Sequence, residues 1–280
     1  MLVNQRVIWE NNTTLTDISL EMNDLFSGTK TIDFVAADDY LYIGSDLPFN
    51  HRYFQISSAN ASASVASVAI WDGSTWNNAV DVLDQTSVSG ATMAQSGIMS
   101  WTTDMNKSWV CEESTENIAA LSTLKIYDMY WVRIGFSGNW TGSTALQYVG
   151  HRFSDDNILT AIYPDLARTS VKTAHTSGKT NWNEQHVIAA EAIIAQLRKG
   201  RIVSSGSQIF GWEMFQLAGA HKVAQIVYAS FGEAKVEERD EAKKQYEEAM
   251  NQIVFNNQDK NADGHLDQSE RFGSVVWRRG

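Results

Sequence analysis

The sequence has very little cysteine and proline. Among 280 residues there is one cysteine, Cys111, and there are two prolines. A single cysteine excludes an internal disulfide framework and is typical of synthesis in a reducing compartment. Cys111 follows Trp109 and Val110, and no base stands near it in the sequence to lower its pKa. We therefore expect a buried structural thiol and not a nucleophile.

Positive charge is also scarce. The chain has 22 Lys and Arg against 33 Asp and Glu, a formal net charge of -11. Because phosphate neutralisation requires clustered Lys and Arg, we expect no sequence-specific nucleic-acid partner. The first six residues lack a basic segment followed by an apolar run, and no stretch is long and apolar enough to span a bilayer. We therefore expect neither a secretory signal nor a membrane partner.

Motifs for the common catalytic chemistries are missing. The six histidines are scattered and form no zinc-binding pattern, and no nucleophile elbow, phosphate loop or dinucleotide fingerprint occurs. The nearest paired carboxylates are Asp38-Asp39 and Glu112-Glu113. Adjacent strand residues point to opposite faces, so we interpret both pairs as turns or strand ends. The sequence predicts that the protein is not an enzyme.

From about residue 30 to 153 the chain alternates short β-branched and aromatic runs with Gly, Asn, Asp and Ser. This pattern predicts an antiparallel β-sandwich, jelly-roll-like in type. Asp72-Gly73 predicts a tight turn. The expected strands are Thr31–Val35, Tyr40–Ile43, Tyr53–Ser57, Ser64–Trp71, Gly97–Thr102, Met129–Phe136 and Ala145–Phe153.

After Phe153 the apolar period changes from two to about 3.6, which predicts helices. Ser154-Asp155-Asp156 is expected to start a short helix that ends before Pro164. Three further helices are expected, over 183–199, 208–231 and 233–255. Gly200 is expected to end the first of these three. Charged residues dominate the start of the last helix, which predicts a solvated face.

The residues 259–270 match an EF-hand-type calcium loop. Carboxylate or amide oxygens stand at loop positions 1, 3, 5 and 9, a backbone carbonyl at 7 and Glu at 12, with Gly264 at the sharp turn. The predicted metal ligands are Asp259, Asn261, Asp263, His265 through its carbonyl, Asp267 and Glu270. Sensor loops occur in pairs. This loop is single, so we expect calcium to act as a structural clamp.

The sequence therefore predicts an α+β, multidomain chain. A β-sandwich domain is expected over 1–153, an α-helical bundle over 154–256, and the calcium loop with a C-terminal tail over 257–280. The two larger domains are not separated by a long linker or a low-complexity tract. We found no internal sequence repeat.

Several short segments resemble structural proteins of tailed bacteriophages. In the first half these are residues 40–45, 47–50, 71–76 and 130–133. In the second half, residues 153–156 leading to 163–166, followed by Ala-rich helices, are similar to the helical domain of head-tail connectors, also called neck adaptors.

The resemblance implies a virion protein that is assembled in the host cytoplasm. In head-tail connectors the helical domain docks in a ring, usually of twelve copies, beneath the portal and extends the DNA channel. The implied partners are therefore copies of this chain and the portal and tail or neck proteins. The family supplies no catalytic motif to carry over.

A second interpretation is a glycan-binding module, either a phage baseplate or fibre component or a secreted carbohydrate-binding protein with a calcium docking segment. Tryptophan rings can stack on sugars. The candidate platforms are Trp71, Trp76, Trp101, Trp109 and Trp140. Burial of most of these rings would remove the platform on which this interpretation depends.

Overall fold

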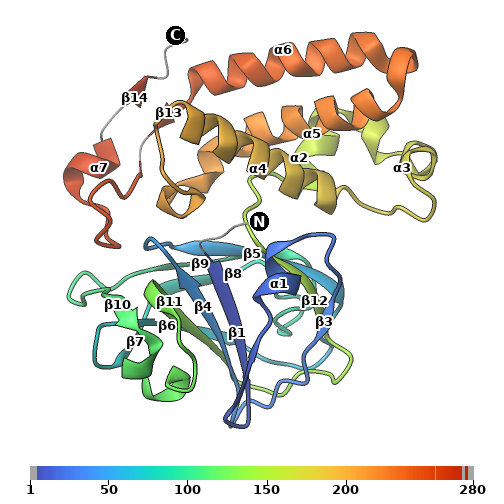
Figure 1. The fold of residues 1–280 in the computed structure, drawn as a ribbon. Coiled ribbons are helices and arrows are strands. Elements are labelled where there is room, and N and C mark those ends of the chain that lie inside the picture. Colours follow the sequence, from blue (N-terminus) through green and yellow to red (C-terminus); the bar gives the residue numbers. More distant parts are fainter. Residues whose placement is uncertain (1–4, 256, 273–274, 277–280) are drawn as a thin grey trace. The chain divides into compact units, whose positions relative to one another are not determined.

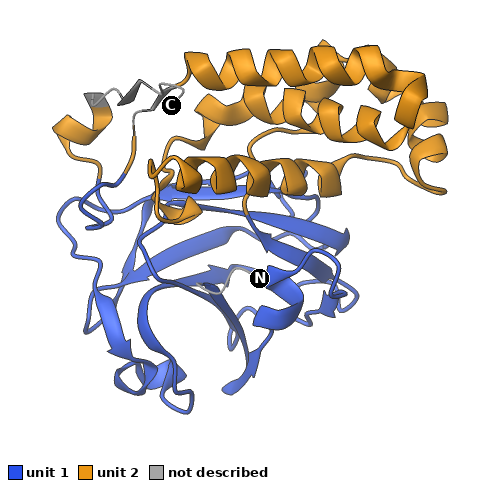
Figure 2. Cartoon of the chain, turned by 45° about the horizontal axis from the view of Figure 1, so that its top comes forward, with its two compact units in different colours: residues 1–150, 259–265 blue, residues 151–258, 266–280 orange. Residues whose placement is uncertain are grey.

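The computed structural model describes residues 5–255, 257–272 and 275–276. Contacts divide the chain into two compact units, coloured separately in Figure 2. Unit 1 comprises Met1–Gly150 with Asp259–His265, and unit 2 comprises His151–Gln258 with Leu266–Gly280. Antiparallel sheets occupy the N-terminal part and helices the C-terminal part, as the α+β prediction requires (Figure 1).

Unit 1 contains two antiparallel sheets among its described residues. One has the order β2-β1-β4-β11-β6-β7, with β10 also paired to β11, and the other has the order β3-β12-β5-β9-β8. The first sheet comprises β1 Gln5–Asn11, β2 Thr14–Asp17, β4 Tyr40–Ser45, β6 Ala66–Trp71, β7 Trp76–Asn78, β10 Cys111–Ser114 and β11 Tyr127–Phe136. The second comprises β3 Lys30–Thr31, β5 His51–Ser58, β8 Val80–Asp84, β9 Gly97–Thr102 and β12 Ala145–Gly150. A short helix, α1 Ser19–Asn23, follows β2.

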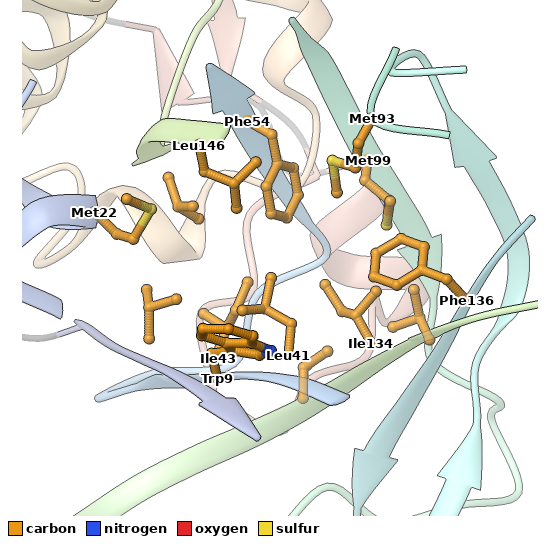
Figure 3. Packing of buried hydrophobic residues seen from close by; sticks show 14 of the residues in the cluster. Trp9, Met22, Leu41, Ile43, Phe54, Met93, Met99, Ile134, Phe136 and Leu146 are labelled. Atoms are coloured by element: carbon orange, nitrogen blue, oxygen red, sulfur yellow. The ribbon is translucent and has the colours of Figure 1, made fainter. Parts of the chain in front are cut away.

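A single hydrophobic cluster draws side chains from both sheets of unit 1 (Figure 3). Leu41 and Ile43 come from β4 and Ile134 from β11, whereas Phe54 comes from β5 and Leu146 from β12. All five are at most 1% exposed. Burial of this apolar surface is the main force that holds the two sheets in one unit.

Strand β11 shows the period of two that its sequence predicts. Val132, Ile134 and Phe136 join the cluster shared by the two sheets. Met129 and Trp131 belong to a second cluster, which also holds Leu121 of the 3₁₀ turn η2 Ala119–Leu121 and Ile118, which lies between η2 and the 3₁₀ turn η1 Thr115–Asn117. Both faces of this strand are therefore covered.

Three expected strands are longer in the prediction than in the structure. The strand expected over Ser64–Trp71 begins at Ala66. Only Lys30–Thr31 of the segment near 31–35 pairs as a strand, although Ile32 and Phe34 are buried. The alternation there reflects burial against the core and not a longer ladder. The strand expected to reach Phe153 ends at Gly150. The turn expected at Asp72-Gly73 is confirmed: Trp71 pairs with Trp76, and Gly73 has a φ of 93°.

Unit 2 consists mainly of helices. They are α2 Asp156–Ile162, α3 Thr169–His175, α4 Asn183–Lys199, α5 Gln216–Ser230, α6 Val236–Gln252 and α7 Gln268–Phe272. Four 3₁₀ turns connect them, η3 Pro164–Ala167, η4 Gly206–Gln208, η5 Trp212–Phe215 and η6 Gly232–Lys235. Strands β13 Val254–Phe255 and β14 Val275–Val276 pair antiparallel.

Local signals set several helix ends. The side chain of Asp155 accepts a hydrogen bond from the backbone N–H of Ile158, so it caps α2 as predicted. Helix α4 spans the predicted 183–199 and ends at Gly200. The expected helix over 208–231 is wrong at its start, because α5 begins at Gln216. Residue Phe210 instead donates its N–H to the carbonyl of Asn257. The 3₁₀ turn η5 occupies the last four positions before α5 begins.

Helix α5 packs against α2, α4 and α6 within unit 2. Its buried residues include Ala218, Gly219, Ala220 and Ala224, whose small side chains permit close approach. Leu217, in the first turn of α5, is 48% exposed. Among the described residues no helix has both the length and the apolar character needed to cross a membrane.

Candidate functional site

The first half of the predicted calcium loop belongs to unit 1 and is ordered by backbone-to-carboxylate hydrogen bonds. Oδ1 of Asp259 accepts from the N–H of Asp263 (3.3 Å) and Oδ2 from the N–H of Gly264 (3.0 Å). Oδ1 of Asp263 accepts from the N–H of His265 (2.8 Å). Gly264 has a φ of 82°, in the left-handed region that glycine adopts without strain. The sharp turn expected at Gly264 is present.

Side chains of unit 1 hold this half-loop against the sheet. The hydroxyl of Tyr130 donates to the carbonyl of Ala262 (3.3 Å), and a ring nitrogen of His265 lies 2.9 Å from the carbonyl of Lys107. A Cβ added at Gly264 would lie 3.0 Å from the Trp109 ring. Burial, with smaller effects from Cys111, Asp259 and Asp263, raises the pKa of the Tyr130 hydroxyl. The negative charges of Asp259 and Asp263 therefore contribute to the raised pKa of Tyr130.

The second half of the loop belongs to unit 2. Glu270 is 4% exposed, and its Oε2 accepts from the N–H of Asp267 (3.1 Å) at the start of α7. This contact is the reciprocal half of a capping box, in which the third helical residue reaches back to the cap. Glu270 therefore stabilises the first turn of α7.

The donor types of the loop suit calcium, which prefers six to eight oxygen ligands. Among the described residues, however, no group of three or more His, Cys, Asp or Glu side chains is gathered as a metal site. Each half of the loop is thus locally ordered, by turn hydrogen bonds in the first and by a capping contact in the second.

In each of the two adjacent acid pairs, one carboxylate is buried and accepts hydrogen bonds from other groups of the fold. The first pair is Glu112-Glu113. Glu112 is buried, and its carboxylate accepts from Nε1 of Trp71 (2.8 Å) and Nδ2 of Asn117 (2.6 Å). Glu113 is exposed, as the alternation of a strand requires. The two carboxylates of this pair therefore do not face one another.

The pair Asp38-Asp39 shows the same division. Asp39 is 1% exposed and accepts from the backbone N–H groups of Asn12 and Val35, both at 2.9 Å. Asp38 is exposed. Each buried acid satisfies polar groups of the fold, which accounts for its burial.

Cys111 is half-buried on β10. Burial, together with the nearby carboxylates of Asp128, Glu112 and Glu113, raises the pKa of its thiol. A raised pKa disfavours the thiolate, which is the nucleophilic form. The prediction that Cys111 is buried was too strong. Its surroundings nevertheless suppress nucleophilic character.

The structure brings together a serine, a histidine and an aspartate of unit 2 that the sequence did not group. Oγ of Ser154 lies 2.8 Å from Nδ1 of His186, and Nε2 of His186 lies 3.1 Å from Oδ1 of Asp156. Asp156 also accepts from the backbone N–H of Trp182, which precedes α4. The neutral imidazole that donates to Asp156 through Nε2 accepts from Ser154 through Nδ1.

This Ser–His–Asp network is buried and tightly packed. Ser154 is 4% exposed and His186 is 0% exposed. A Cβ added at Gly219 on α5 would lie 2.7 Å from Oγ of Ser154, so the helix covers the hydroxyl closely. Acyl transfer needs room for a substrate carbonyl beside the hydroxyl. The packing instead assigns the network a structural role, in which it joins the start of α2 to α4.

Most of the candidate sugar-stacking tryptophans lie inside unit 1. Trp71, Trp101, Trp109 and Trp140 are between 2% and 5% exposed. Trp76 is half-buried, and its ring packs against Trp71 (centroids 5.2 Å apart) and Tyr42 (5.6 Å). Four of the five rings therefore offer no open face for a sugar.

Comparisons of the chain with protein-family models, with curated proteins and with solved structures found no match.

Proposed function

We propose that this protein is a structural component of a tailed-phage virion, a head-tail connector or neck adaptor that forms a ring between portal and tail. In this proposal the helices of unit 2 supply contacts to neighbouring copies and to the portal or a tail protein. Unit 1 contacts a neighbouring virion protein. The chain would be assembled in the host cytoplasm, with no enzymatic activity and with no membrane or sequence-specific nucleic-acid partner.

The burial of the tryptophans is the observation that favours this proposal over the glycan-binding alternative. A glycan-binding face needs aromatic rings that are open on one side. In unit 1 these rings fill the interior instead, as with Trp101 and Trp140 in the main cluster. A scaffold whose aromatics serve packing suits an assembly role better than a sugar-binding role.

The finer architecture that we propose for unit 1 is a β-sandwich of jelly-roll type. Consecutive strands β4, β5 and β6 alternate between the two sheets, and so do β11 and β12. Such crossing connections are typical of a jelly roll, and the cluster shared by the two sheets would be the interior of the sandwich.

An exposed apolar segment of unit 1 is suited to a protein contact. Leu20 on α1 and Phe26 just after it are 66% and 72% exposed. The Ser27 hydroxyl bonds the carbonyls of Leu20 and Glu21, which closes the segment into one compact turn. Two large apolar side chains on one ordered turn resemble the anchors of protein interfaces.

The test is assembly of the full chain. We expect the purified protein to form closed rings by negative-stain electron microscopy, or to join portal or tail components in co-sedimentation. The variant Leu20→Ser with Phe26→Ser should lose the association made by unit 1 but keep its thermal midpoint. The matched control, Leu83→Ser with Val65→Ser, removes exposed apolar side chains elsewhere and should associate normally. A wild-type chain that stays monomeric and binds no particle component would refute the proposal.

Calcium enters the proposal as a structural ion. The ligands would be the side chains of Asp259, Asn261, Asp263, Asp267 and Glu270 and the carbonyl of His265. The ordered turn at Gly264 and the donor types support this assignment. Binding would draw the loop's carboxylates around one cation and so reduce their mutual repulsion.

A further inference from the structure

Helices α4, α5 and α6 of unit 2 lie side by side (Figure 1), and a pocket of about 180 Å³ opens among them. Its lining includes Gln196 of α4, Lys222 and Gln225 of α5, and Lys243 and Tyr246 of α6. The two residues from α5 are three positions apart, and so are these two from α6, so each pair shares one face of its helix. The volume is below the roughly 300–1,000 Å³ of sites for drug-sized ligands, so the pocket suits a single small chemical group.

The pocket is rich in hydrogen-bond donors that have no acceptor. Nζ of Lys222 donates to Oε1 of Gln225 (3.0 Å), and the Tyr246 hydroxyl donates to Oε1 of Gln196 (2.5 Å). Both amide oxygens are therefore occupied, whereas neither Nε2 group has an acceptor among the described residues. An ammonium has three N–H donors and an amide has two. Lys222 thus keeps donors in reserve, and Lys243 makes no hydrogen bond with any residue that the structure describes.

The two lysines also lack a negative partner. Neither Lys222 nor Lys243 forms an ion pair within the described part of the chain. The ammonium of Lys222 lies over the ring of Tyr246, 4.9 Å from its centroid. Burial and, to a smaller extent, the charge of Lys243 lower the pKa of Lys222, and no carboxylate counteracts this lowering, although Glu247 also lines the pocket. A bound anion would offset the repulsion between the two ammonium groups.

We propose that this pocket binds a phosphate group, either as the free ion or as the terminal phosphate of a larger molecule. The unused donors are ammonium and amide groups, which come from three helices and therefore approach from different directions. A tetrahedral oxyanion accepts hydrogen bonds from several directions, whereas a carboxylate offers two oxygens in one plane. Lysine is a common phosphate ligand, in which it acts as a point charge.

The alternative is that Lys222 only covers the ring of Tyr246. The apolar stem of a lysine often lies along apolar surface while its ammonium reaches water. Lys243 would then belong to the charged and solvated face of α6. This explanation gives the two amide groups no role, and it predicts that phosphate does not bind saturably.

Methyl NMR of the full chain with labelled methionine tests the proposal, because Met250 lines the pocket and is 3% exposed. Inorganic phosphate is titrated at constant ionic strength, with chloride as the balancing ion. We expect the Met250 methyl signal, identified with Met250→Leu, to shift saturably. The signal of Met22, in the core of unit 1, should not move.

Two further probes define the ligand. Acetate is the carboxylate control and should not shift the Met250 signal saturably. A saturable shift with glycerol 3-phosphate would identify the terminal phosphate of a larger molecule as the ligand, whereas a shift with inorganic phosphate alone would identify the free ion. If neither phosphate produced a saturable shift, or if acetate produced the same one, the proposal would be overturned.

Single-charge variants locate the binding. Lys222→Met and Lys243→Met should each weaken it at least about tenfold, because each removes a charged donor. The control, Lys244→Met, removes the same charge from the next residue of α6, which is exposed and does not line the pocket, and should bind as the wild type does. Glu247→Gln removes a carboxylate from the lining and should strengthen binding. Equal weakening by Lys243→Met and Lys244→Met would overturn the proposal, and circular dichroism verifies that each variant is folded.

Discussion

Nε2 of His186 lies 3.1 Å from Oδ1 of Asp156, with the histidine fully buried and 30 residues further along the chain. Burial lowers the pKa of His186, although the Asp156 carboxylate acts in the opposite direction. Burial acts to raise the pKa of Asp156, but the hydrogen bond from His186 and the nearby charges lower it overall. The pair therefore keeps a neutral imidazole beside a carboxylate.

This arrangement predicts a loss of stability in acid. An unfolded histidine titrates near pH 6.5, and the folded His186 titrates lower. Below that pH the unfolded state binds more protons, so the free energy of unfolding falls by up to about 1.4 kcal/mol per pH unit for this group. Urea unfolding between pH 7.5 and pH 5 measures the slope.

Burial also lowers the pKa values of His51 and His221, so the contribution of His186 to the slope requires a variant. His186→Gln keeps a donor towards Asp156 but cannot titrate, and it should reduce the slope of stability against pH. His175→Gln, on a more exposed histidine whose pKa is also lowered, is the control and should change the slope less. An unchanged slope in His186→Gln would contradict the assignment.

Gly219 is predicted to be intolerant of alanine. Alanine favours a helix interior by about 1 kcal/mol relative to glycine, but here its Cβ would lie 2.7 Å from Oγ of Ser154. We expect Gly219→Ala to lower the free energy of unfolding by about 1–3 kcal/mol. Ser154→Gly removes the atom that the new Cβ would clash with. In a double-mutant cycle, the double variant should therefore lose less free energy of unfolding than the sum of the two single variants. Additive effects would mean that the two residues do not touch.

Replacing either of the two neighbouring glutamates of β10 should change the free energy of unfolding by very different amounts. Glu112 is buried and accepts hydrogen bonds from Trp71 and Asn117, so Glu112→Ala leaves two donors unsatisfied. We expect a loss of about 2–3 kcal/mol in the free energy of unfolding. Glu113→Ala is the matched control and should change it by less than about 0.5 kcal/mol. Equal losses would refute the structural role of Glu112.

Calcium is predicted to raise the melting temperature and to lower the pKa of Tyr130. The cation would offset the field of Asp259 and Asp263, which contributes to the raised pKa of that hydroxyl. Absorbance titration of tyrosine ionisation with calcium and with a chelator measures the shift, with Tyr130→Phe to identify the signal.

The loop variants complete that test. Asp259→Ala with Glu270→Ala should lose the calcium effect on the melting curve. Gln268→Ala changes an exposed residue of the loop that is not a predicted ligand and should keep it. A wild-type melting curve that is identical with calcium and with chelator would contradict the structural-ion proposal.

Elements with strong local signals were predictable. Helix α4 agrees with its prediction at both ends because its apolar stripe is regular and Gly200 stops it. Strand β9 agrees at both ends as well. Strand β1 was missed, because its residues are buried on both faces and show no alternation. The edge strands β2 and β8 were missed because they are short and partly exposed.

The sequence by itself determined the change from strands to helices, the capped start of α2, and the turns at Gly73 and Gly264. Each depends on residues within a few positions, where backbone sterics and local hydrogen bonds act. Only the tertiary structure decided the burial of the tryptophans and the Ser154–His186–Asp156 network. These contacts join residues that lie tens of positions apart, and long-range packing leaves no local signal.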